Sequence, residues 1–114
     1  MQPVSPDEFR LLVADALDTL PPQLSGHFSN VVLVVEDDDP SDPDLLGLYE
    51  GIALTERDHY SGALPDRISL YRIPLCLLAE DLDDLRAEIR TTVIHEFAHH
   101  MGIDDDRLHQ LGWS

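Results

Sequence analysis

The sequence predicts an α+β fold, with about three strands in one sheet and helices packed on it. The chain has 114 residues, which suffice for one hydrophobic core, so residues 1–114 are expected to form one domain. Apolar residues recur at helical spacing near the start and again in the second half. Three short segments between those regions have the composition of strands. That order favours a small sheet with helices gathered on one face.

The first helix begins at Ser5. Ser5 supplies a cap, Pro6 suits the first helical position, and Glu8 completes a capping box. Pro21 and Pro22 end the helical pattern. The expected apolar face comprises Phe9, Leu12, Val13, Ala16, Leu17 and Leu20.

Three strands are expected next. Residues 31–35 form an unbroken valine and leucine run, which predicts a buried strand. Residues 46–54 form the second, with Gly47 and Gly51 as weak points. Residues 68–73 alternate between apolar and polar side chains and form the third.

Two polar segments connect these strands. Residues 36–44 are acidic and contain two prolines, but they lack the glycine and the final glutamate of an EF-hand, so a solvated loop is expected instead of a calcium site. The loop at residues 55–67 is long enough to suggest a function. Residues 74–79 lead to the next helix, and Cys76 among them is expected as a small core residue instead of a metal ligand.

Residues 81–101 read as one long helix. Three aspartates crowd its start, where carboxylates cap free N–H groups, and Gly102 supplies the left-handed residue that closes a helix. Residues 104–111 form a short final helix. The apolar stripe of the long helix comprises Leu82, Leu85, Ile89, Val93 and Phe97.

The long helix carries the sequence H-E-x-x-H-x-x-G-x-x-D. His95 and His99 are four residues apart, so they project from one helix face and suit one metal ion, while Glu96 beside them is placed to act as a general base. H-E-x-x-H alone arises in roughly 2% of shuffled chains of this composition. Requiring Gly102 and Asp105 as well lowers the frequency to roughly 0.01%.

This region resembles the small bacterial zincin-like metallopeptidases, also called minimal zincins. The resemblance rests on T-x-x-H-E-x-x-H-H-x-G-x-D-D-D-R-L at residues 92–108, on L-G-L-Y at 46–49, and on P-D-R-I-S-L-Y-R at 65–72. It therefore extends over most of residues 28–113. Larger metzincins carry histidine where this chain has Asp105, and they add a methionine turn downstream that has no counterpart here.

The resemblance implies a zincin-like domain that binds Zn²⁺ through His95, His99 and Asp105. It implies a zinc-dependent metallopeptidase that hydrolyses peptide bonds through a Glu-activated, zinc-bound water, with Glu96 as the catalytic base. In zincins a sheet edge runs beside the metal helix and pairs with an extended substrate. The alternative is a non-catalytic zinc-binding or protein-interaction domain with a degenerate zincin fold.

Other residues compete for roles in this site. Asp104 and Asp106 compete with Asp105, because any of the three could cap the final helix. His100 points about 100° away from His99, so it is expected to pack elsewhere. The final helix also carries His109, which could approach the site. Candidates to stabilise an oxyanion are Tyr71, Tyr60 and His59, although structural roles are expected for them.

Composition limits the partners. The net charge is −16, with seven arginines, no lysine and 23 acidic residues, so nucleic acid and anionic membranes would be repelled. The expected partner is a peptide or protein substrate. Neither a spanning helix nor a signal peptide is visible, and Cys76 is the single cysteine. A reducing cytoplasm fits these features.

Overall fold

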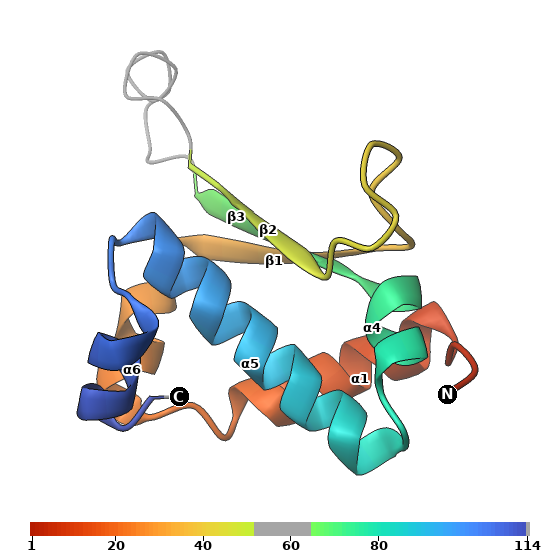
Figure 1. Cartoon of the computed structure of the whole chain (residues 1–114), viewed down its shortest axis with the longest axis horizontal. Coiled ribbons are helices and arrows are strands. Elements are labelled where there is room, and N and C mark those ends of the chain that lie inside the picture. Colours follow the sequence, from red (N-terminus) through yellow and green to blue (C-terminus); the bar gives the residue numbers. More distant parts are fainter. Residues whose placement is uncertain (52–64, 114) are drawn as a thin grey trace.

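The computed structural model describes residues 1–51 and 65–113, and it confirms the α+β class. One three-stranded sheet lies above the helices (Figure 1). The elements are α1 Pro6–Leu17, α2 Pro22–Ser25, the 3₁₀ helix η1 Gly26–Phe28, β1 Val31–Glu36, β2 Gly47–Glu50, β3 Asp66–Tyr71, α4 Arg72–Leu78, α5 Leu82–His100 and α6 Asp105–Leu111.

The sheet has the strand order β1-β3-β2 and is mixed. β3 is central, pairs in parallel with β1 and pairs in antiparallel fashion with β2. In the register, Leu70 faces Val35 on one side and Gly47 on the other. Both β1 and β2 are therefore edges of the described sheet, and β2 is the edge that contacts α5.

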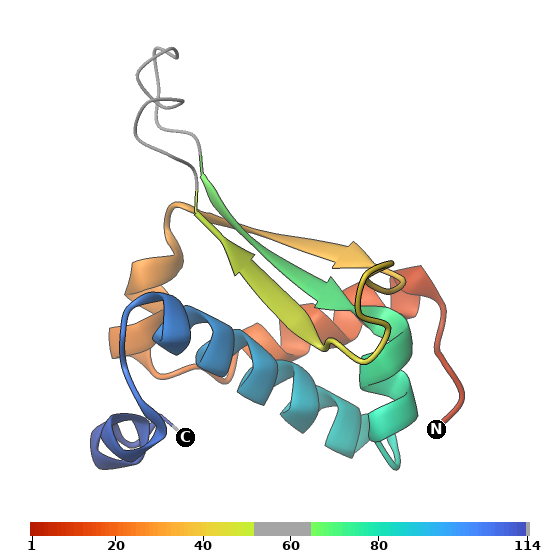
Figure 2. The same ribbon diagram turned by 45° about the horizontal axis from the view of Figure 1, so that its top comes forward.

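Helices cover one face of this sheet (Figure 2). The inner face carries Ile68 and Leu70, which are fully buried against α1 and α5. On the outer face Val32 is 44% exposed. The expectation that residues 31–35 form a strand is correct, but the expected burial is wrong, since all five residues are half-buried or exposed. The run is apolar throughout, yet β1 lies at an edge of a sheet that has helices on one side.

The bounds of the other strands differ from the sequence expectation. β2 ends at Glu50, and residues 52–54 lie outside the described part of the chain. β3 begins two residues before Ile68 and ends at Tyr71, because Arg72 starts helix α4. The segment expected only to lead into the long helix is thus itself a helix, and α2 and η1 were likewise not expected.

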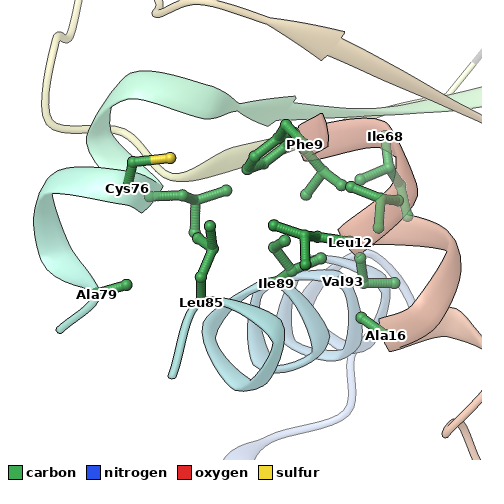
Figure 3. Close-up of a cluster of buried hydrophobic side chains, with 12 residues drawn as sticks. Phe9, Leu12, Ala16, Ile68, Cys76, Ala79, Leu85, Ile89 and Val93 are labelled. Carbon is green, nitrogen blue, oxygen red and sulfur yellow. The ribbon is translucent and has the colours of Figure 1, made fainter. Parts of the chain in front are cut away.

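The main core lies between α1, α4, α5 and the sheet. Figure 3 shows Phe9 and Leu12 of α1 meeting Ile89 and Val93 of α5. Cys76 is fully buried there, as expected from the sequence. A second cluster packs α2 and α6 against the last turns of α5, through Leu20, Leu24, Ile94, Phe97, Ala98 and Leu108. Together the two clusters fix α5 along its whole length.

Local interactions at both ends of α5 set its bounds. The N–H of Asp84 donates to Oδ1 of the N-cap residue Asp81 at 2.8 Å, and the N–H of Glu80, just before the cap, donates to Asp84 Oδ2 at 2.9 Å. Gly102 has a φ of 74°, and the N–H of Ile103 donates to the Ala98 carbonyl at 2.8 Å. This is the six-to-one bond of a Schellman motif. The H-E-x-x-H residues consequently occupy the last turns.

Within the described residues, no helix combines the length and the apolar character that crossing a bilayer would require.

Candidate metal centre

The last turns of α5 bring three side chains of the motif together. His95 and His99 lie one turn apart on the same helix face, and their ring centroids are 6.2 Å apart. Glu96 lies on the same side, with its Oε2 atom 3.9 Å from His99 Nδ1. The helix predicted from periodicity therefore places both imidazoles and the carboxylate in one site.

These side chains line a pocket of about 370 Å³ between α5 and the chain that leads into β2. The helix contributes one face, which runs from Glu88 to His99. The opposite wall comes from the loop before β2 and from its first residue. The lining residues are Asp42, Asp44, Leu45, Leu46, Gly47, Glu88, Thr91, Thr92, His95, Glu96 and His99. The pocket is thus long enough to extend well beyond the two histidines.

Glu96 is the more enclosed partner of the motif. Its side chain is 22% exposed, whereas that of His99 is 63% exposed. Desolvation raises the pKa of the Glu96 carboxyl above its ordinary value, and the nearby His99 and His95 partly offset that rise. A raised pKa brings a carboxylate closer to neutral pH, where it is a better proton acceptor.

The donor set fits a zinc ion. Zinc binds imidazole nitrogen at about 2.0–2.1 Å, which places the ion roughly 3.2 Å from a ring centroid. In a tetrahedral site, two rings that share one ion have centroids roughly 5.2 Å apart by the same geometry. The His95 and His99 centroids are 6.2 Å apart, so the rings would have to rotate towards each other to bind one ion.

Asp105 lies outside this arrangement. It is the first residue of α6, and its side chain is exposed. Among residues 1–51 and 65–113, no three histidine, cysteine or acidic side chains gather closely enough to share an ion. Asp104 caps α6, because its Oδ1 accepts a hydrogen bond from the Arg107 N–H at 2.8 Å. The structure therefore joins two of the three expected ligands.

The other candidate residues lie elsewhere. His100 stacks on Tyr49, with centroids 3.9 Å apart and planes 17° apart, away from the pocket lining. Tyr71 is buried, its hydroxyl donates to Asp39 at 3.3 Å, and burial raises its pKa. His109 is exposed on α6. Tyr60 and His59 lie outside the described residues.

Sequence reasoning missed the wall opposite the helix. Asp42 and Asp44 were assigned to a solvated loop, and Gly47 was regarded as a weak point in a strand. Both assignments considered each segment alone, whereas the pocket joins residues that lie more than 40 positions apart in the chain. Helical spacing from His95 could have found Glu88 and Thr92, since they lie seven and three residues before it on the same face.

Gly47 is the closest point between β2 and α5. A Cβ atom on this residue would lie 2.7 Å from the Thr92 methyl carbon and 3.1 Å from the Ser69 carbonyl oxygen. It would also lie 3.6 Å from Cγ of Glu96. Only a residue without a side chain lets the strand approach the helix beside the motif.

Replacing Gly47 with alanine should therefore lower the free energy of unfolding by about 1–3 kcal/mol, the usual cost of overpacking. Adding Thr92→Ser should recover part of the loss. Serine lacks the methyl group but retains the hydroxyl that donates to the Glu88 carbonyl at 2.8 Å. Urea denaturation of the two variants measures both effects.

Gly26→Ala is the matched control. Gly26 has helical backbone angles, and a methyl group added to it would meet nothing within 4 Å, so stability should stay level or rise by up to about 1 kcal/mol. Equal losses in the Gly26 and Gly47 variants would show that steric contact with Thr92 is not the cause.

An H-E-x-x-H helix beside the edge strand of a small mixed sheet places this protein in the zincin class of folds. A family profile described as zincin-like metallopeptidase matches residues 28–113, and the chain belongs to that family. Among solved structures, it resembles a conserved hypothetical protein from Thermus thermophilus. The TM-score is 0.56 at 23% identity, over 86% of this chain and 94% of the other. No curated protein matches the chain.

Proposed function

We propose that the protein is a zinc-dependent metallopeptidase. The observation that supports this most directly is the enclosed Glu96 beside two imidazoles on one helix face, at the wall of an open pocket. Zinc bound there would supply a Lewis acid that lowers the pKa of a water and polarises a carbonyl. The substrate would be a peptide or protein segment lying in the pocket. The protein would work in the cytoplasm, since a reducing compartment suits the free thiol of Cys76.

The residues have separate roles in this proposal. His95 and His99 hold the ion as neutral imidazoles. Glu96 takes a proton from the attacking water and then delivers it to the amine that leaves as the peptide bond breaks. Its low exposure suits this role, because desolvation keeps its proton affinity above that of an exposed carboxylate.

We propose Asp105 as the third ligand. It follows the turn at Gly102, which reverses the chain after the motif, and it stands at the start of a helix whose cap is provided by Asp104. Its carboxylate is consequently not needed for capping. The second candidate is a domain with a degenerate zincin fold that performs no catalysis. It is kept because the described residues bring two imidazoles together but no third ligand.

A peptide hydroxamate distinguishes these candidates. A catalytic zinc with three protein ligands keeps a position for an added bidentate group, whereas a closed structural site has none. The hydroxamate should therefore raise the melting temperature of zinc-loaded protein and leave that of the apo protein unchanged, because a ligand stabilises the state that it binds. Differential scanning calorimetry at several hydroxamate concentrations measures the shift.

Stripping of zinc by the hydroxamate would lower the melting temperature, so the sign of the shift separates binding from extraction. A peptide amide of the same sequence, which lacks the chelating group, is the control. Hydroxamates of varied side chain that cause no shift, together with an uncleaved peptide library, would favour the non-catalytic candidate.

A further inference from the structure

The pocket beside the motif is lined by carboxylates over much of its length. Glu88 lies on α5 two turns before His95, and Asp42 and Asp44 lie on the loop across from it. None of the six arginines in the described part of the chain belongs to the lining. A ligand that enters this pocket therefore meets acidic side chains on both walls.

Among residues 1–51 and 65–113, no arginine forms an ion pair with these three carboxylates. In the part of the chain that the structure describes, the arginine ion pairs involve Asp7, Glu50, Asp37, Asp15 and Asp83. Asp42 instead accepts a hydrogen bond from the Asp44 N–H at 3.2 Å, which holds the two residues in one turn. Because a cleft lined by one sign of charge concentrates ligands of opposite charge, the pocket should attract cations.

Helix geometry sets the distance between the acidic end and the motif. Glu88 precedes His95 by seven residues, which corresponds to about 10 Å along the helix axis. An extended peptide advances about 3.3 Å per residue, so that distance corresponds to about three substrate residues. A basic side chain at that separation from the cleaved bond would reach the carboxylates.

We infer, on the basis of the proposed function, that the substrates are cationic peptide segments, with lysine or arginine within about three residues of the cleaved bond. The basic side chain contacts Glu88, Asp42 and Asp44, while the peptide bond lies near His95 and Glu96. These three carboxylates determine specificity and take no part in the bond cleavage itself.

Binding of labelled peptides tests this inference without requiring turnover. Fluorescence anisotropy compares a decapeptide carrying arginines near its centre with one in which glutamine replaces them. The cationic peptide should bind roughly tenfold more tightly. Glu88→Gln and Asp44→Asn should each weaken its binding by about threefold, the scale of a partly exposed ion pair. Binding of the neutral peptide should weaken less than binding of the cationic peptide.

Glu8→Gln is the matched control, since Glu8 is exposed on α1, carries the same charge and is absent from the pocket. It should leave both affinities unchanged. If Glu8→Gln weakens binding of the cationic peptide as much as Glu88→Gln does, the net charge of the whole chain causes the preference and the inference is wrong. Tighter binding of the neutral peptide would also overturn it. Melting temperatures establish that each variant is folded.

Cleavage assays with the same peptides separate this inference from the proposed function. If cationic peptides bind in a Glu88-dependent manner but are never cleaved, the pocket prefers cationic peptides and the proposed peptidase activity is rejected. Faster cleavage of neutral or acidic peptides would support the peptidase activity and reject the inferred preference for cationic peptides.

Discussion

Replacing Glu96 with glutamine should lower peptide hydrolysis by about 100-fold or more, the scale of lost general-base catalysis. Glutamine preserves the shape of the side chain and removes its ability to accept the proton of water. Zinc content should stay unchanged, because Glu96 lies beside the ligands and is not proposed to bind the ion. The measurement is kcat/KM on a neutral peptide, with zinc determined on the same preparation.

A matched variant shows whether removing one negative charge is by itself enough to lower turnover. Glu8→Gln removes one carboxylate from α1, outside the pocket lining, and should retain full turnover. Equal turnover in the Glu96 variant and in the unmodified protein, with contaminating peptidases excluded, would reject the proposed mechanism. Loss of zinc from the Glu96 variant would instead show that Glu96 is itself a ligand.

The long helix could be predicted from sequence because local interactions determine it. The acidic cap at Asp81 and the left-handed Gly102 are signals within a single turn of the chain, and both have the expected geometry. The apolar stripe gives the helix phase, which in turn places His95 and His99 on one face. Most of the candidate site follows from these three features.

The sheet was less predictable because strand order depends on distant segments. The run at residues 31–35 predicts a strand, but nothing in it indicates an edge position or parallel pairing with β3. Arg72 and Ile73 continue the alternating polar and apolar pattern of the third strand and yet start α4. The position of β1 and the end of β3 are therefore set by tertiary packing more than by local composition.

The pocket wall shows the same limitation in the site. Within its own segment Gly47 only weakens a strand. The need for glycine there becomes visible only in the fold, where Thr92 and Glu96 approach it closely. Asp44 belongs to an acidic loop whose neighbour in space is Glu88, 44 positions away in the chain. Asp105 represents the opposite case. The family resemblance implies that it is a zinc ligand, but the described residues do not gather it with His95 and His99.

Replacing either His95 or His99 with alanine should abolish zinc binding. The unmodified protein should retain about one zinc per chain after incubation with zinc and dialysis, since two imidazoles and one carboxylate form a common zinc site. Each variant loses one of the two nitrogen ligands. Asp105→Asn should weaken zinc affinity, whereas Asp106→Asn should not.

The most direct measurement is the zinc content of His99→Ala beside that of His100→Ala, determined by elemental analysis. The two residues are neighbours in the chain but face different surroundings, since His99 lines the pocket and His100 stacks on Tyr49. We predict that the His99 variant is empty and that the His100 variant retains about one zinc per chain. Zinc retained without His99 and lost without His100 would contradict the proposed metal centre.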